Sequence, residues 1–165
     1  MNFLKYRNLF SGNLNTAMEE KKYKTIIKNK KARFEYFIEE EYEAGIVLKG
    51  TEVKSLRLGN VNLSDSYAKI TNEEVFLCNM NISEYKFGNI MNHEPKSDRK
   101  LLLHKKQIRK LCSKIQEKGF TLVPLSIYLK NGKVKVELGL CKGKKLYDKR
   151  DTIKQRDLDR EISGY

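Results

Sequence analysis

The chain has 165 residues, and its 34 Lys and Arg against 21 Asp and Glu give a formal net charge of +13 at pH 7. A chain of this length can form one domain with a substantial core, and no apolar run approaches the roughly 20 residues of a membrane helix, which excludes a membrane span. The charge excess favours nucleic acid or an anionic membrane surface as partner, with nucleic acid preferred and solvated surface charge as the alternative.

Residues 1–28 are predicted to be a flexible arm, because their apolar residues follow no sustained pattern. The first 17 residues carry Lys5 and Arg7 but no acid, as in a transit peptide, which would indicate an organellar protein. The alternative is that Met18 is the true initiator, and we favour that interpretation.

From Phe34 to Leu48 the alternation of side chains predicts one or two strands. Thr51 is then predicted to cap a short helix that buries Leu56 and ends just before Gly59.

Two further strands, residues 63–70 and 75–82, are predicted on either side of a hairpin connection at residues 71–74. Residues 83–99 lack periodicity and are predicted to be a long loop, and loops of that length are usually functional or mobile.

The clearest helix follows, because one side is apolar, the other side is basic, and Gly119 ends it. Its apolar side is predicted to consist of Leu101, Ile108, Leu111, Cys112 and Ile115. Strands at residues 121–129 and 134–141 then flank Asn131-Gly132, the strongest short hairpin signal.

These elements predict a mainly β fold, a small antiparallel OB-like barrel of about six strands with two or three flanking helices. The barrel is predicted to span residues 29–146. Residues 147–165 are predicted to be a basic C-terminal tail that is disordered until a partner orders it, because a free helix that short is marginal in water.

Positive charge is concentrated in two segments. Residues 96–118 hold nine Lys or Arg against two acids, and residues 142–150 hold five against Asp148 alone. The first segment is equally well interpreted as a solvated helix face. In the second, Gly143 lets the backbone approach a phosphate, and Tyr147 offers a ring on which an unpaired base can stack. The second segment is therefore the better candidate for RNA contact.

Catalytic and metal motifs are absent from the sequence. His93 and His104 lie in no nucleophile motif, and His93 is predicted to be a hydrogen-bonding loop residue. The acids of residues 39–43 alternate between two strand faces, which favours a solvated edge over a magnesium site. The three cysteines have no metal or disulfide spacing and are predicted to be buried thiols of a reducing compartment. They are Cys78, Cys112 and Cys141. We expect no cofactor and no enzyme activity.

Several long stretches of sequence then become recognisable. They are Asn29-Lys30-Lys31-Ala32-Arg33, Tyr36-Phe37-Ile38-Glu39-Glu40, Glu43-Ala44-Gly45-Ile46, Gly50-Thr51-Glu52-Val53-Lys54-Ser55-Leu56-Arg57, Asp65-Ser66-Tyr67, Arg99-Lys100-Leu101-Leu102-Leu103-His104 and the run from Leu138 to Arg150. Together they resemble the SmpB family, the SsrA-binding proteins of bacterial trans-translation. The resemblance covers about residues 29–162, in order and without large gaps.

The resemblance implies an OB-like barrel and a monomeric protein of the bacterial cytoplasm. Such a protein binds the tRNA-like domain of tmRNA and, with elongation factor Tu on that RNA, accompanies it to the A site of a stalled ribosome. The C-terminal tail is implied to act in the small-subunit decoding centre and the empty mRNA channel.

The resemblance also implies roles for individual residues. Those matched to RNA binding, or to support of that surface, are Asn29, Arg33, Tyr36, Glu43, Arg57, Lys100, Leu102, Lys142, Lys144 and Lys145. Those matched to the decoding-centre segment are Tyr147, Asp148, Lys149 and Arg150.

The sequence departs from the family pattern at Phe34 and Tyr147, where relatives have His, and only 15 residues follow Arg150. The alternative functions are a generic single-strand RNA-binding OB module and an RNA-processing enzyme.

Overall fold

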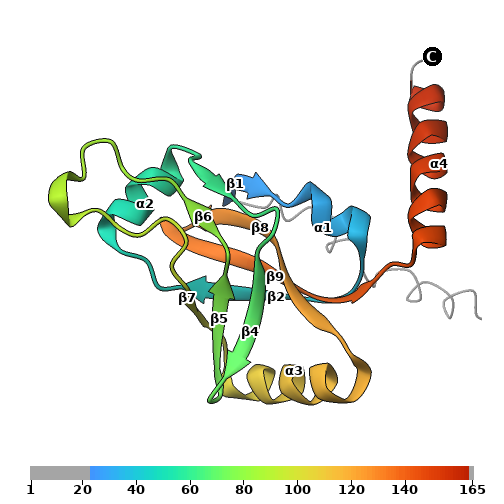
Figure 1. Ribbon diagram of the computed structural model, residues 1–165, viewed down its shortest axis with the longest axis horizontal. Helices are drawn as coiled ribbons and strands as arrows, with labels where there is room; N and C mark the ends of the chain where they lie inside the picture. Colours follow the sequence, from blue (N-terminus) through green and yellow to red (C-terminus); the bar gives the residue numbers. More distant parts are fainter. Residues whose placement is uncertain (1–22, 164–165) are drawn as a thin grey trace, which may run out of the picture.

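Six strands close into a ring (Figure 1), and all six contribute to one cluster that contains most of the buried apolar side chains. The computed structural model describes residues 23–163, except for the side chains of residues 117 and 118. In chain order the elements are β1 (Tyr23–Lys28), α1 (Lys30–Glu35), β2 (Tyr36–Ile46), α2 (Gly50–Arg57), β3 (Val61–Asn62), β4 (Tyr67–Thr71), β5 (Glu74–Cys78), β6 (Asn81–Ile82), the 3₁₀ turn η1 (Asn89–Met91), β7 (Arg99–Leu102), α3 (Lys105–Lys118), β8 (Thr121–Lys130), β9 (Lys133–Gly143) and α4 (Leu146–Ser163).

Antiparallel pairing holds the ring together. Its strands lie in the order β8-β4-β5-β7-β2-β9, and pairing of β9 with β8 closes it. The pairing of β2 with β9 runs from Tyr36 opposite Gly143 to Gly45 opposite Lys135. β1 pairs with β8 as an additional strand, and β3 pairs with β6 in a separate two-stranded sheet. The predicted antiparallel barrel of about six strands is confirmed.

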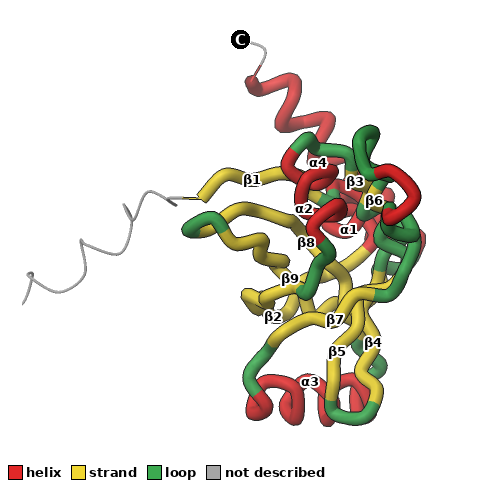
Figure 2. The backbone as a smooth tube through the Cα atoms, turned by 90° about the vertical axis from the view of Figure 1, so that its left-hand side faces the viewer, coloured by secondary structure: helices red, strands yellow, loops and turns green. Residues whose placement is uncertain are grey.

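Two apolar clusters position the helices. The main cluster fills the ring and includes Leu56 of α2 and Leu111 of α3, and α3 lies across one end of the strands (Figure 2). The second cluster lies on the other face of β8 and β9, where Ala32 of α1 packs with Val123 and Cys141. This second cluster fixes α1 against the outside of the barrel.

The two predicted hairpins are confirmed by their backbone geometry. Asn72 and Glu73 have φ of +51° and +58°, and Asn131 and Gly132 have φ of +51° and +74°. Two consecutive residues with positive φ form the type I′ turn, whose twist matches that of the flanking strands.

Two predictions for the N-terminal part of the chain are wrong. Residues 23–28, predicted as part of the arm, form β1, because Ile26 and Ile27 pack against the main cluster. A register shift between Thr25 and Ile27 interrupts the alternation that would have indicated a strand. Residues 30–35 form α1 instead of the beginning of a strand at Phe34. The rest of the predicted arm, with both candidate start residues, lies outside the described residues.

Two helix boundaries also differ from the prediction. Lys49, not Thr51, precedes the first turn of α2, and the Glu52 carboxylate accepts the Lys49 backbone N–H at 2.7 Å. Leu101 belongs to β7, where it lies opposite Val75 and Ile46, so its helical spacing from the residues of α3 is coincidental.

The C-terminal tail, predicted to be disordered without a partner, is the helix α4 in the structure. None of its described residues is buried. The helix stands beside α1 and points away from the barrel (Figure 1).

Candidate RNA-binding surface

A cluster of unpaired positive charge lies where β9 leaves the barrel and α4 begins. We call residues 142–150 the tail root. Among the described residues, none of its five Lys and Arg side chains forms an ion pair. Lys142, Lys145 and Arg150 are exposed, and Tyr147 is 70% exposed. The tail root therefore offers free cations and an accessible aromatic face, the combination that unpaired RNA bases and their phosphates require.

Lys144 differs from its neighbours because its contacts join the tail root to the barrel. Its backbone N–H donates to the Glu35 carbonyl at 2.8 Å. Its Nζ lies 4.9 Å from the centroid of the Phe37 ring and donates to Thr152 Oγ1 at 3.2 Å. Lys144 therefore positions α4, and fewer of its N–H donors are free to bind a phosphate.

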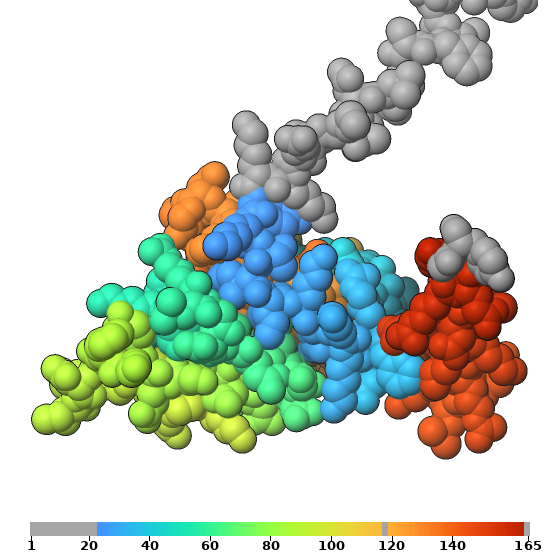
Figure 3. All heavy atoms as spheres, turned by 90° about the horizontal axis from the view of Figure 1, so that it is seen from above, coloured from blue at the N-terminus to red at the C-terminus, as the bar shows by residue number. Residues whose placement is uncertain are grey.

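Two further contacts orient the start of α4. The Asp148 carboxylate accepts the Lys145 backbone N–H at 2.9 Å, which satisfies a donor at the helix N-terminus. The Arg156 guanidinium lies 5.3 Å from the centroid of the Phe34 ring of α1, within cation–π range. Figure 3 shows α4 standing out from the body of the protein beside the segment that contains α1.

The structure gives Asn29 a supporting position. Its side chain is buried, its Oδ1 accepts the Ala32 N–H at 3.1 Å and so caps α1, and its Nδ2 donates to the carbonyls of Leu63 and Pro124. The nearby Tyr36 is half-buried against the second apolar cluster.

Ion pairs neutralise much of the first basic segment, residues 96–118. On α3, Lys110 and Lys114 both contact the Glu40 carboxylate of β2, and Arg109 lies 3.8 Å from Glu73. Hydrogen bonds from Lys114, Tyr42 and Lys110 lower the pKa of Glu40 to about 2. This segment is therefore a much weaker anion-binding surface than its composition indicated.

Glu43, Lys100 and Leu102 meet at a groove of about 430 Å³ beside the start of α3. The Glu43 carboxylate accepts hydrogen bonds from Lys130 Nζ at 2.8 Å and from the Tyr128 hydroxyl at 2.7 Å, which lower its pKa. Lys100 pairs with Glu74 of β5. Leu102 is 53% exposed, so it is the member of this trio that offers a free contact.

Other predicted residues lie elsewhere. Arg33 is exposed on α1, 3.7 Å from Glu41. Arg57 is exposed at the end of α2, and α2 lies on the side of the molecule away from α4 (Figure 1).

The structure explains the histidine and cysteine predictions. His93 is buried, with Nδ1 3.0 Å from Thr51 Oγ1 and Nε2 3.1 Å from the Ile82 carbonyl, so the predicted hydrogen-bonding role is confirmed.

Cys78 and Cys141 are buried free thiols, Cys112 is half-buried, and burial raises the pKa of Cys141 to about 11. Within residues 23–163, no cluster of acids, histidines and cysteines is suited to hold a metal ion.

The family model "SmpB protein" matches residues 26–164. The chain belongs to the SmpB family. It is 61% identical to a protein named SsrA-binding protein from Acetivibrio thermocellus over 88% of this chain and 94% of that protein. It is 62% identical to the SsrA-binding protein of Caldicellulosiruptor bescii over 84% of this chain and 88% of that protein.

A solved structure is also similar to this SmpB-family chain. It is described as "tmRNA-SmpB: a journey to the center of the bacterial ribosome", with 50% identity and a TM-score of 0.62. The similarity covers 73% of this chain and 85% of that chain. Among the described residues, no helix is long and apolar enough to cross a membrane.

In this SmpB-family chain, the predicted site residues fall into three places: the tail root with neighbouring α1, the groove beside α3, and Arg57 on α2. The ring beneath Lys144 belongs to Phe37, which the sequence motifs did not single out for this contact. The available signal was the strand alternation, which places Phe37 on the polar side with Glu39, opposite to Tyr36 and Ile38.

Proposed function

We propose that this protein binds the tRNA-like domain of tmRNA, the SsrA RNA, and delivers it to the A site of stalled ribosomes. It acts there as a binding protein rather than an enzyme, in the cytoplasm of a bacterium. Elongation factor Tu accompanies it on the same RNA. The result is rescue of the ribosome and tagging of the incomplete protein for degradation.

The observation that carries this proposal is membership of the SmpB family across residues 26–164, which include the six-stranded barrel and all of α4. The relatives carry the name SsrA-binding protein, and the similar solved structure is described as tmRNA-SmpB in the bacterial ribosome. The unpaired cations of the tail root agree with an RNA partner, because each phosphate that they neutralise adds salt-dependent affinity.

The two parts of the molecule have separate tasks in this proposal. The barrel binds structured RNA, which proteins recognise through phosphates, 2′-hydroxyls and unstacked loop bases. Tyr147, Asp148, Lys149 and Arg150 act in the decoding centre, and the remainder of α4 occupies the mRNA channel. The exposed apolar side chains of α4 beyond Arg150 are available for that contact, and they are Ile153, Leu158 and Ile162.

The decisive experiment is recovery and sequencing of the RNA that co-purifies with the full chain from its own cells. We expect strong enrichment of tmRNA over bulk tRNA. Uniform recovery of unpaired RNA would instead indicate a generic single-strand-binding module, and the proposal would then fail.

A second experiment tests whether the tail root contacts phosphates. Lys142→Ala combined with Lys145→Ala removes two exposed, unpaired cations, so the slope of log affinity against log salt should fall by about two. The matched control combines Lys24→Ala with Lys133→Ala, two exposed cations outside the tail root, and should leave the slope nearly unchanged. Equal effects of the two double variants would contradict a specific contribution from the tail root.

A further inference from the structure

The loop between β6 and β7 presents large apolar side chains to solvent. Phe87 is 74% exposed, Ile90 is 101% exposed and Met91 is 88% exposed. The Tyr85 ring lies against Phe87 edge to face, with centroids 5.7 Å apart. We call residues 84–92 the apolar loop. Figure 1 shows that it projects from the end of the molecule opposite α4.

Local contacts give the apolar loop a defined shape. The Asn92 side chain closes it by accepting the Tyr85 N–H at 3.2 Å and donating to the Tyr85 carbonyl at 2.9 Å. The Gly88 N–H also donates to the Tyr85 carbonyl at 2.8 Å. A Cβ atom at Gly88 would lie 2.8 Å from the Asn92 side chain and would displace that side chain from its hydrogen bonds with Tyr85.

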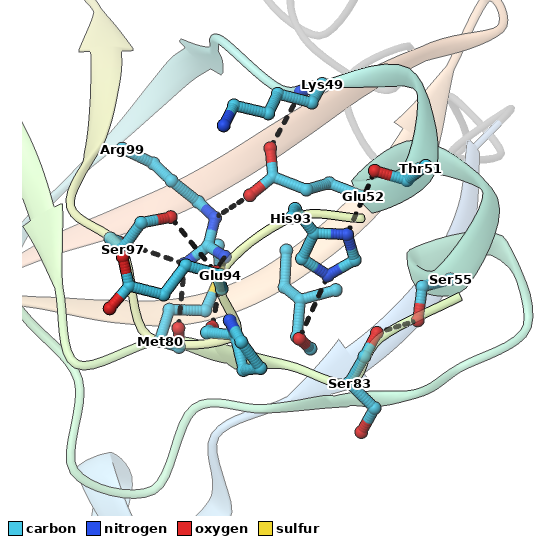
Figure 4. A network of polar contacts seen from close by, with 12 residues as sticks. Lys49, Thr51, Glu52, Ser55, Met80, Ser83, His93, Glu94, Ser97 and Arg99 are labelled. Carbon is cyan, nitrogen blue, oxygen red and sulfur yellow. Dashed lines mark hydrogen bonds and ion pairs between the residues drawn. The ribbon is translucent and has the colours of Figure 1, made fainter. Parts of the chain in front are cut away.

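A buried polar network holds the base of the apolar loop against the barrel (Figure 4). Just beyond the loop, His93 bonds Thr51 of α2 and the Ile82 carbonyl of β6. The Arg99 guanidinium donates to the carbonyl of Pro95 at 3.1 Å. Because shape and attachment are both fixed before any partner binds, little ordering of the loop opposes binding.

The charges around the loop favour RNA over an apolar protein surface. The Lys54 Nζ lies 5.5 Å from the centroid of the Tyr85 ring. Lys86 is exposed within the loop itself, and Arg57, three residues after Lys54 on α2, is also exposed. In the described part of the chain, none of these three cations has an ion-pair partner. Rings that stack on a base, beside cations that neutralise phosphates, match an unpaired nucleotide.

We propose that the apolar loop binds an unpaired base of the tRNA-like domain of tmRNA. Phe87 stacks on the base, and Lys54 and Lys86 contact the adjoining phosphates. This inference rests on the proposed function. In that function α4 is committed to the ribosome, so the opposite end of the molecule is the one free to hold the RNA that the protein carries.

The test compares two substitutions of Phe87 in the full chain. Phe87→Leu keeps an apolar side chain but cannot stack, whereas Phe87→Trp retains an aromatic face. Binding to a fluorescently labelled tRNA-like domain is measured by anisotropy across a salt series. Since stacking contributes about 1–3 kcal/mol per base, Phe87→Leu should weaken binding by about 5- to 150-fold, and Phe87→Trp should bind like the unsubstituted protein.

The salt dependence separates stacking from charge. Phe87→Leu should leave the salt slope unchanged, whereas Lys54→Ala should lower it by about one. Val47→Ala, an exposed apolar position that directly follows β2, is the control and should not change affinity. Because Phe87 is exposed, its substitution should leave the thermal unfolding midpoint unchanged. Measuring this midpoint verifies that each variant is folded.

The outcomes distinguish this inference from the proposed function. If the unsubstituted protein does not bind the tRNA-like domain, the proposed function fails and this inference fails with it. If it binds and Phe87→Leu binds equally well, only the loop contact is overturned. Normal RNA binding by Phe87→Leu with loss of peptide tagging would assign the loop to a ribosomal or protein partner and would also overturn the inference.

Discussion

Arg99 Nε lies 2.8 Å from Glu52 Oε1, and the two side chains are only 2% and 4% exposed. The Arg99 guanidinium also donates to backbone carbonyls, including that of Met80, and Glu52 accepts the Lys49 N–H. Both charges are thus paired and hydrogen-bonded out of water. The pair connects α2, the base of the apolar loop and β7 (Figure 4).

Glu52→Gln should destabilise the protein by about 3–5 kcal/mol, because it leaves the Arg99 charge buried without its counter-ion. Urea denaturation at pH 7 measures the change. Glu73→Gln is the matched control, because its ion pair with Arg109 is more than two-thirds exposed and contributes at most about 1 kcal/mol. Similar losses in both variants would show that burial does not control the strength of these pairs.

The lowered pKa of Glu40 predicts a specific response of protein stability to acid. Its pKa in the folded protein is lowered to about 2 by hydrogen bonds from Lys114, Tyr42 and Lys110. A carboxyl with a lowered pKa stabilises the fold above its unfolded pKa, about 4.3, and loses that contribution as the pH falls towards 2.

We therefore expect Glu40→Gln to lower the urea midpoint at pH 7 but to have little effect near pH 2. The control is Glu39→Gln on the same strand, where the described residues provide no ion pair. A difference between Glu40→Gln and the unsubstituted protein that stays constant across this pH range would contradict the assignment.

Lys144 should hold α4 in place through the Phe37 ring and Thr152. Lys144→Met keeps most of the apolar stem but removes the charge and the donor. Hydrogen exchange of the backbone amides of α4 should then become faster, because local opening is less strongly opposed. Lys142→Met, an exposed neighbour, should leave the exchange unchanged, and equal acceleration in both variants would contradict an anchoring role.

Removal of residues 151–165 should separate RNA binding from ribosome rescue. The deletion spares the barrel and the tail root, so affinity for the tRNA-like domain should remain near normal. Tagging of peptides on stalled ribosomes should be abolished, because the helix proposed to enter the mRNA channel is missing. Parallel loss of both activities would mean that α4 is part of the RNA-binding body.

The sequence predicted the parts of the fold that local patterns determine. The two I′ turns followed from turn residues at Asn72 and Asn131-Gly132, and the end of α3 followed from Gly119, which has a φ of +63°. The antiparallel barrel followed from short strands joined by such turns.

The sequence failed where long-range contacts decide the structure. β1 is a strand because β8 supplies a partner, and its register shift hides the alternation. Leu101 matched the helical pattern of α3 by spacing, yet its partners Val75 and Ile46 place it in a strand.

The candidate site shows the same division. The excess of positive charge in residues 142–150 indicated the tail root correctly as a cationic segment. The positive charge of residues 96–118 wrongly indicated a strong anion-binding surface. Several of its cations are paired with Glu40, Glu73 and Glu74, which come from other strands and turns. Charge counted along a chain does not reveal which carboxylates the fold brings to it.

Because β9 closes the ring, the barrel cannot form until β9 has been synthesised. β9 pairs on one side with β2, near the start of the described chain, and on the other with β8. A polypeptide whose synthesis stops before residue 133 therefore has two exposed strand edges, which are prone to pair with other chains. The barrel can be completed only after Gly143, the last residue of β9, has been synthesised, so this protein depends for its own folding on synthesis that continues uninterrupted to that residue.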